Sequence, residues 1–251
     1  MMISKYSASG NDFVIFHALE KKDRTSLAIE VCNRQNGIGA DGLVVLIPHD
    51  KYDFEWQFYN SDGSHADMCG NASRATAHYA FINEIAGKTM SFLTGAGVIN
   101  AEIKKSNGKK SAIVMSELTP PKIIDKTIVY NDKSWWLIDT GVPHLVHFAN
   151  DISVFDIAEA RELRNKYNAN VNIAQIDGKN IRVRTYERGV EDETLACGTG
   201  MAACFYKAFV EKNVSDSIEV YPISGETLYL GHNGETITFE GEVKNTFNAV
   251  W

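Results

Sequence analysis

The sequence is organised around two short stretches, Met68-Cys69-Gly70-Asn71 and Ala196-Cys197-Gly198-Thr199-Gly200. In each of them a Cys-Gly pair ends a polar loop and opens a run of small residues, at 72–77 and at 201–205, that predicts a helix. The same arrangement thus occurs once in each half of the chain, which indicates a weak internal duplication.

Strand-like segments make up most of the remaining chain, and four helices are predicted among them, at residues 26–34, 71–83, 154–167 and 199–212. The pair Pro120-Pro121 is the best internal boundary, because neither residue can continue a strand ladder. On both sides of it the order is the same: strands, an amphipathic helix, more strands, a Cys-Gly helix and a closing hairpin. We therefore expect two similar α+β lobes with a cleft between them.

The bulk composition argues against several classes of protein. The 251 residues are 44% hydrophobic and 23% charged, which is ordinary for a globular chain. The net charge of −7 argues against nucleic acid or an anionic membrane as the main partner. No apolar stretch approaches the ~18 residues of a membrane span and no signal-peptide pattern is seen, so we expect a cytoplasmic protein with reduced thiols.

The four cysteines do not have the spacing of a disulfide framework or of a metal site. Cys32 and Cys204 lie on predicted helices and are expected to be buried free thiols. Cys69 and Cys197 are different, because each stands at the start of a helix. There the unpaired N–H groups and the helix dipole lower the pKa of a thiol.

This placement suggests one particular chemistry. The N–H groups of Gly70-Asn71 and Gly198-Thr199 can hold a substrate carboxylate next to the thiol. The α-proton of an amino acid is a very weak acid, and its removal needs a positioned base and strong electrostatic help. Two equivalent thiols could remove a proton from one face of a carbon and add one to the other, as an amino-acid epimerase or racemase without a cofactor does.

Further motifs accompany the two cysteines in order along the chain. They are Tyr6-x3-Gly10-Asn11-Asp12-Phe13-Val14, Gly37-Ile38-Gly39-Ala40-Asp41-Gly42, Asn60-Ser61-Asp62-Gly63-Ser64, Gly141-Val142-Pro143-His144, Asn170-Val171-Asn172, Tyr186-Glu187-Arg188-Gly189 and Glu193-Thr194-Leu195. With these motifs the sequence resembles the diaminopimelate epimerase family, from Tyr6 to about Gly241.

The resemblance implies an isomerase that uses no pyridoxal phosphate, other cofactor or metal and forms a homodimer. Its partner would be a small-molecule amino-acid substrate, and it would interconvert LL- and meso-2,6-diaminopimelate for lysine and peptidoglycan precursor synthesis. Cys69 and Cys197 fall on the family's acid/base pair, and His144 and Glu187 fall on residues that tune the two thiols. The positions that fall on substrate contacts are Asn11, Asn60, Gly70, Asn71, Asn172, Glu187, Arg188, Gly198 and Thr199.

The sequence departs from the common family pattern at three positions. Gly42 stands where many members have Gln, Val142 where many have Asn, and Ala72 where many have Gly. The first two positions contact the substrate in the family. Two hydrogen bonds of the family's pocket are therefore expected to be absent or to be supplied by other groups.

We thus expect an α+β fold of two pseudo-symmetric lobes, each a curved, mostly antiparallel sheet or barrel around a central helix, with the active site in the cleft between them. The N-terminal lobe would span residues 1–118 and the C-terminal lobe residues 119–239, with residues 240–251 packing back onto the first. Three alternatives remain at this point: a racemase of another amino acid on the same frame, a cysteine hydrolase that uses one thiol with His144 as base, and a binding protein without activity.

Overall fold

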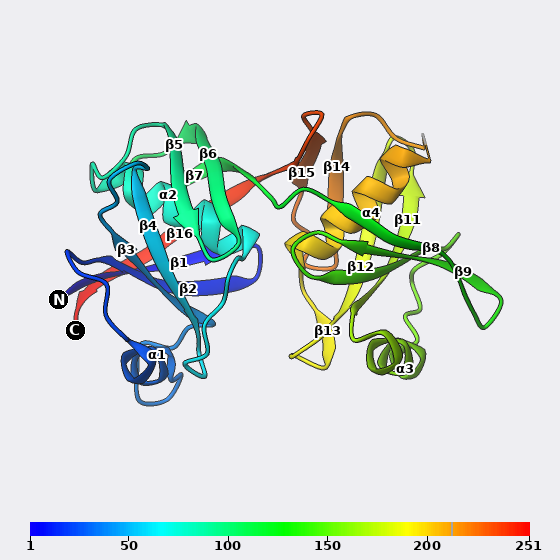
Figure 1. Ribbon diagram of the computed structural model, residues 1–251, viewed down its shortest axis with the longest axis horizontal. Helices are drawn as coiled ribbons and strands as arrows, with labels where there is room; N and C mark the ends of the chain where they lie inside the picture. The colour runs from blue at the N-terminus through cyan, green and yellow to red at the C-terminus, as the bar shows by residue number, and fades with distance from the viewer. Residues whose placement is uncertain (212) are drawn as a thin grey trace. The chain divides into compact units, whose positions relative to one another are not determined.

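The computed structural model describes residues 1–211 and 213–251. The chain divides into two compact units. Unit 1 comprises Met1–Glu117 and Glu240–Trp251, and unit 2 comprises Leu118–Phe239. Each unit has its own set of strands, an outer helix and an inner helix (Figure 1), and β16 belongs to both sets.

Unit 1 is a closed barrel of eight strands. In the order of the sheet they are β1 (Met2–Ala8), β2 (Asn11–His17), β3 (Gly42–Ile47), β4 (Phe54–Asn60), β5 (Thr89–Thr94), β6 (Gly97–Ser106), β7 (Ser111–Glu117) and the later part of β16 (Ile237–Val250). Antiparallel pairing of β1 with β16 closes the barrel. The pairs β2/β3 and β4/β5 are parallel, so each needs a crossover connection.

The two crossovers of unit 1 carry its helices. Helix α1 (Thr25–Cys32) joins β2 to β3 and packs on the outside of β3 and β4. Helix α2 (Gly70–Ile82) joins β4 to β5 and lies within the ring of strands (Figure 1). All but two of its residues are buried, and most of these are small, because only a slim helix fits inside a barrel of eight strands.

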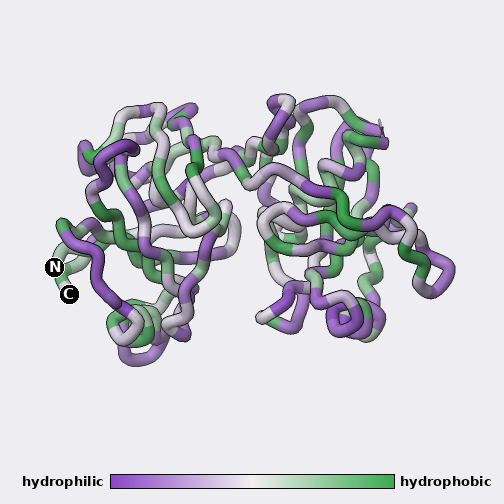
Figure 2. The backbone as a smooth tube through the Cα atoms, viewed as in Figure 1, coloured by the Kyte–Doolittle hydropathy of each residue, from purple (hydrophilic) through white to green (hydrophobic). Residues whose placement is uncertain are grey.

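Strand β3 shows which residue types are needed where helices cover both faces of the sheet. All six of its residues are buried, and its apolar stretch can be followed in Figure 2. Val44 and Leu46 belong to the core around α2, whereas Leu43, Val45 and Ile47 belong to the core beneath α1. A strand that is covered on both faces needs a continuous apolar run instead of an alternating one.

Unit 2 repeats this topology. Its strands, in sheet order, are β8 (Lys122–Tyr130), β9 (Lys133–Asp139), β10 (Pro143–Phe148), β11 (Asn170–Asp177), β12 (Asn180–Glu187), β14 (Ser217–Pro222), β15 (Leu228–His232) and the start of β16, with the short β13 (Asp192–Thr194) beside β12. The parallel pairs are β10/β11 and β12/β14. The first is joined through α3 (Ile157–Tyr167), and the second through α4 (Gly198–Val210), which begins directly after Cys197.

The expected α+β fold of two similar units is therefore confirmed, but the sequence analysis missed two parts of it. Strand β1 was not predicted, because Ser4 and Lys5 interrupt its apolar pattern; both are buried and have polar partners. Strand β16 continues to Val250, beyond residue 239, where the C-terminal lobe was expected to end. The end proposed for the fourth helix, Lys212, lies outside the described residues.

Helix α3 starts later than predicted, at Ile157 instead of residue 154. Asp156 is its N-cap, and the carboxylate accepts a hydrogen bond of 3.0 Å from the backbone N–H of Glu159. No helix among the described residues is long and apolar enough to cross a membrane.

Candidate active site

Cys69 is placed by the inner helix of unit 1. It is the N-cap residue of α2, with an extended backbone (φ −150°, ψ 122°), and is partly buried. The first helical hydrogen bond to its carbonyl comes from Ser73 N–H, at 2.9 Å. The N–H groups of Gly70 and Asn71 precede that bond and so have no carbonyl within the helix to donate to. Thiol and amide donors therefore lie together, as the sequence predicts.

Asn11 and Asn71 are brought into direct contact in unit 1. Asn11 follows the tight Ser9-Gly10 turn between β1 and β2, and Asn71 is the second residue of α2. Asn71 Nδ2 donates to Asn11 Oδ1 at 2.7 Å, and Asn11 Nδ2 donates to Asp41 Oδ2 at 3.0 Å. Two predicted substrate contacts from distant parts of the sequence are thus adjacent to each other, and one of them, Asn71, lies two residues after Cys69.

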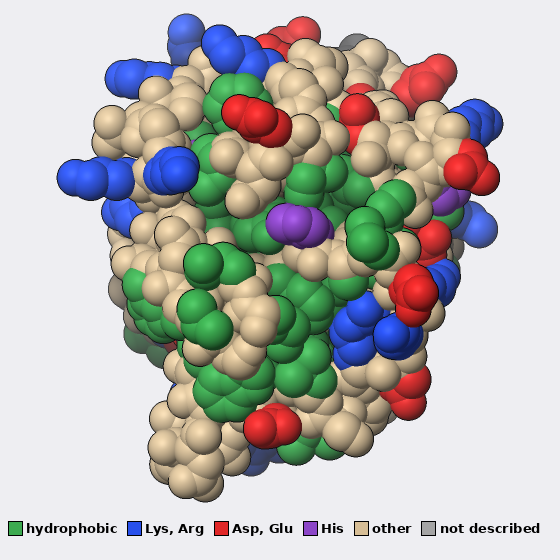
Figure 3. Space-filling view, turned by 90° about the vertical axis from the view of Figure 1, so that its left-hand side faces the viewer, with side chains coloured by type: hydrophobic (Ala, Val, Ile, Leu, Met, Phe, Trp, Pro, Cys, Tyr) green, Lys and Arg blue, Asp and Glu red, His purple; other side chains and the backbone are tan. Residues whose placement is uncertain are grey.

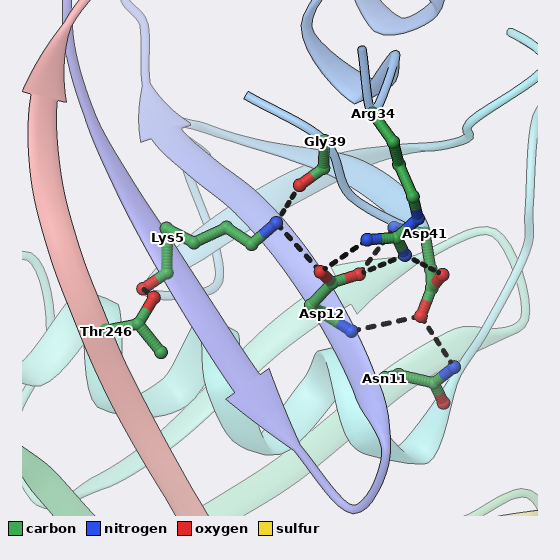
Figure 4. Close-up of polar contacts among 7 residues, drawn as sticks. All are labelled: Lys5, Asn11, Asp12, Arg34, Gly39, Asp41 and Thr246. Carbon is green, nitrogen blue, oxygen red and sulfur yellow. Dashed lines mark hydrogen bonds and ion pairs between the residues drawn. The ribbon is translucent and has the colours of Figure 1, made fainter. Parts of the chain in front are cut away.

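A cluster of charged side chains supports this pair (Figure 4). Arg34 donates to both carboxylate oxygens of Asp12, at 3.1 and 2.9 Å, and to Asp41 Oδ1 at 2.7 Å. Lys5 Nζ lies 2.8 Å from Asp12 Oδ2. Burial raises the pKa of Asp12, but the hydrogen bonds from Arg34 and Lys5 outweigh it and hold the pKa below its ordinary value.

Asn60 lies at the end of β4, directly opposite Gly42 of β3. It is exposed, and its amide donates to Ser64 Oγ at 2.9 Å. A Cβ at Gly42 would lie 2.7 Å from the ring of Phe58 and 2.8 Å from the carbonyl of Tyr59. Glycine at position 42, where many family members have Gln, therefore fits the packing, because Phe58 occupies the space that a side chain would need.

Cys197 has the equivalent position in unit 2. It is the N-cap residue of α4, it is buried, and its carbonyl accepts from Met201 N–H at 2.9 Å. Its sulfur lies 3.6 Å from the hydroxyl oxygen of Thr199. Thr199 was predicted, with Gly198, to offer its backbone N–H to a carboxylate, and its side chain in addition contacts the thiol.

A chain of hydrogen bonds leads from the core of unit 2 to this thiol. Asn172 Nδ2 donates to His144 Nδ1 at 3.1 Å, and His144 Nε2 lies 3.0 Å from Thr199 Oγ1. Burial first, and the positive charge of Arg188 second, lower the pKa of His144 to about 3, so the ring is neutral near pH 7. Since Nδ1 accepts, Nε2 must carry the proton and donate to Thr199, whose own proton can then point to the Cys197 sulfur.

Asn172 is fixed by several contacts within the core. Its amide oxygen accepts from Thr185 Oγ1 at 2.8 Å, and its nitrogen also donates to the carbonyl of Leu145 at 2.9 Å. A Cβ on Gly200 would lie 2.3 Å from that oxygen, so glycine is needed where α4 passes over it. Asn172 is fully buried, and its side chain contacts the ring of His144.

Glu187 and Arg188 lie at the end of β12 and are both half-buried. Glu187 Oε2 accepts from Thr194 Oγ1 at 2.8 Å. The backbone N–H of Arg188 donates to Asn170 Oδ1 and its guanidinium donates to the carbonyl of Asn168, each at 2.8 Å. Asn170 pairs with His144 across β10 and β11, so these residues belong to the surroundings of the histidine.

Several supporting residues were missed by the sequence analysis: Lys5, Asp12, Arg34, Asp41, Arg74, Thr140 and Thr185. Arg74 offered a signal, because it is one charged residue in a run of small ones, three positions after Asn71 on a helix. The others become recognisable only once the strands are paired.

Comparison with known proteins supports the same interpretation over almost the whole chain. A model of the diaminopimelate epimerase family matches residues 3–124 and 136–243. The chain is 59% identical over 250 residues to the diaminopimelate epimerase of Nitratiruptor sp., covering 99% of this chain and 98% of that protein. The chain belongs to the diaminopimelate epimerase family.

A second relative in this family is less similar in sequence, and proteins with other names share the fold. The Helicobacter pylori diaminopimelate epimerase is 44% identical, covering 97% of this chain and 94% of that one. A solved probable proline racemase from Agrobacterium radiobacter has a TM-score of 0.78 at 14% identity, covering 100% of this chain and 92% of that one. A phenazine biosynthesis protein of the PhzF family from Bacillus anthracis has a TM-score of 0.72 at 16% identity, covering 99% and 98%. These last two likenesses concern the fold alone.

The contact between Thr199 and Cys197 can be tested with an isosteric change. We expect Thr199→Val to raise the pKa of the Cys197 thiol by about one unit, because a hydrogen bond to a charged group is lost. The measurement is the pH dependence of iodoacetamide alkylation at Cys197, read by mass spectrometry. Thr199→Ser keeps the hydroxyl and is the control; equal pKa values in the Val and Ser variants would contradict the hydrogen bond.

The neutral His144 predicts a pH dependence of stability. The unfolded chain binds a proton at this ring below pH about 6.5, whereas the folded protein does not until about pH 3. The free energy of unfolding should therefore fall by up to about 1.4 kcal/mol per pH unit from this residue as the pH drops through that window. In His144→Gln that part of the slope should vanish. Urea denaturation at pH 4, 5, 6 and 7 measures it, and parallel curves for the two proteins would refute the assignment.

Proposed function

We propose that this protein interconverts LL- and meso-diaminopimelate without a cofactor, with Cys69 and Cys197 as the two acid/base groups. The main support for the proposal is that the inner helix of each unit begins with the same Cys-Gly pair. Membership of the diaminopimelate epimerase family gives the substrate.

Inversion at an α-carbon requires a base on one face and an acid on the other. In one direction the thiolate of one cysteine removes the α-proton while the thiol of the other donates a proton, and the reverse reaction exchanges these roles. Each turnover therefore leaves the two thiols in the opposite protonation states. The helix N–H groups next to each cysteine stabilise the thiolate and the carboxylate of the carbanion-like transition state.

His144 acts on this reaction through Thr199. Because the neutral ring donates from Nε2, the threonine hydroxyl is turned toward Cys197 and favours its thiolate. Glu187 is proposed as a second group that tunes the thiols. The proposed active site also includes residues that bind the substrate or orient the side chains around it: Asn11, Asn60, Asn172 and Arg188.

Replacing either active cysteine tests the proposal directly. We expect Cys69→Ala and Cys197→Ala each to lower epimerisation of LL-diaminopimelate by at least about 1,000-fold, since general acid–base catalysis contributes up to about 10⁴-fold. Cys204→Ala is the matched control, because Cys204 is a buried free thiol on the same helix as Gly198. The assay follows loss of the LL-isomer, with histidine, glutamate and proline as competing substrates.

Two results would count against the proposal. Turnover near the wild-type rate in either active-site variant would contradict the two-base assignment. Faster turnover of histidine, glutamate or proline than of LL-diaminopimelate would contradict the proposed substrate while leaving the chemistry in place.

We further propose that the protein is a homodimer, as the family resemblance implies, and that the surface at the chain termini takes part. Met2 and Val250 are direct partners in β1 and β16, and their side chains are 66% and 77% exposed. Met1 and Trp251 are also exposed and join the same two chain ends, where Trp251 N–H donates to the carbonyl of Met1 at 2.9 Å. Apolar side chains gather on the face shown in Figure 3. A second copy of the chain would remove this apolar surface from water.

A charge on this surface should weaken the dimer. We expect Val250→Glu to raise the dimer dissociation constant at least tenfold, because burying one valine is worth about 1.5–3 kcal/mol. Analytical ultracentrifugation measures it. Val154→Glu is the control, since Val154 is 80% exposed and lies in unit 2. A monomeric wild-type protein, or an unchanged dimer in Val250→Glu, would contradict this surface assignment.

A further inference from the structure

Two asparagines of unit 1 lie in a continuous line of hydrogen bonds that has a charged residue at each end. Arg74 Nη2 donates to Asn71 Oδ1 at 2.5 Å. Asn71 Nδ2 donates to Asn11 Oδ1 at 2.7 Å, and Asn11 Nδ2 donates to Asp41 Oδ2 at 3.0 Å. The line runs from a fully buried guanidinium to a half-buried carboxylate.

The chemistry of the two ends fixes the direction of the whole line. A guanidinium can only donate, so the atom of Asn71 that faces Arg74 must be the amide oxygen. A carboxylate can only accept, so the atom of Asn11 that faces Asp41 must be the amide nitrogen. Turning over either amide would place two donors or two acceptors against each other at one end of the line.

Both ends are themselves held in place. The Arg74 nitrogen that bonds Asn71 also donates to Ser9 Oγ at 2.9 Å. Ser9 lies at the tip of the hairpin that carries Asn11 and has a positive φ of 48°. Asp41 accepts from the backbone N–H of Asp12 at 3.0 Å and from Arg34 at 2.7 Å, as Figure 4 shows.

The protein fixes which way each of the two amides points. In both of them the oxygen faces a donor of the protein and accepts one hydrogen bond from it. Among the hydrogen bonds of the described residues, each amide uses one of its two N–H groups in this line, which leaves one N–H to donate to a ligand.

We propose that Arg74 and Asp41 are positioning residues that fix the orientation of the Asn11 and Asn71 amides, so that each amide presents an N–H group to a carboxylate of the substrate. The inference rests on the proposed function, because it assigns these two amides to one kind of group on an amino-acid substrate. It also gives a buried arginine and a surface aspartate a shared role that neither motif alone suggests.

The first test replaces the acceptor-only end of the line. In Asp41→Asn the new amide can donate or accept, so residue 41 no longer dictates which atom of Asn11 faces it. We expect KM for LL-diaminopimelate to rise about tenfold or more, with kcat changed by less than about threefold, since one oriented hydrogen bond to the substrate is lost. Asp177→Asn is the matched control, because it makes the same change at an arginine-paired aspartate in unit 2.

A double exchange separates positioning from simple structural support. In Asn11→Asp combined with Asp41→Asn, the residues at 11 and 41 can again form a hydrogen bond, but in the reverse direction. We expect the melting temperature to recover toward the wild-type value while KM stays raised about tenfold, because a carboxylate at position 11 has no N–H to donate to the substrate. Recovery of KM in the double variant, or an unchanged KM in Asp41→Asn, would overturn the proposal.

The orientation of the amides can be determined without substrate. Neutron diffraction of the protein locates the amide deuterons, and we expect Asn11 Nδ2 to face Asp41 and Asn71 Oδ1 to face Arg74. A reversed amide would overturn the inference even if the enzyme is an epimerase. Absence of diaminopimelate turnover in the wild-type protein would instead contradict the proposed function, so the two failures are distinguishable.

Discussion

The structure depends on packing one helix against the inner side of the strands in each unit, and in unit 1 these strands close into a ring. Such a helix must be narrow, which explains the alanine, serine and glycine residues of α2 and α4. It must also begin somewhere, and the first N–H groups of a helix have no carbonyl partner within it. In both units the residue at that point is a cysteine followed by glycine. The same constraint that shapes the core therefore places a thiol beside the unpaired N–H groups of a helix N-terminus in each unit.

The two units support their cysteines by different means. In unit 2 a neutral, fully buried histidine is oriented by Asn172 and reaches Cys197 through the hydroxyl of Thr199. In unit 1 charged residues at both ends of a line of amides fix the direction in which Asn11 and Asn71 donate. The topology is duplicated, but the polar groups around the two helix N-termini are not. This difference is consistent with a substrate whose isomers present different groups to each thiol.

The sequence predicted those elements that can be recognised from a pattern of neighbouring residues. The inner helices were recognisable from small residues after Cys-Gly, and the two-unit fold from the repeated order of elements. Strand β1 was not recognisable, because Ser4 and Lys5 are buried with partners outside the strand, Asn248 for Ser4 and the carbonyl of Gly39 for Lys5. The role of Thr199 was also hidden, since its contact with His144 depends on how α4 packs against β10. Polar residues whose partners are remote in sequence cannot be assigned before the fold is known. The reason for glycine at position 42 also depends on the fold, because the ring of Phe58 on the neighbouring strand fills the space that a side chain would need.

The central claim is that two bases, and not one, handle the α-proton. Conversion of LL-diaminopimelate in heavy water, with purified protein and no added cofactor, tests it most directly when substrate and product are analysed early in the reaction. The account predicts deuterium at the inverted carbon of the meso product while the recovered LL substrate still carries its original proton. A product that retains the original proton, or equal deuterium in substrate and product from the start, would contradict it.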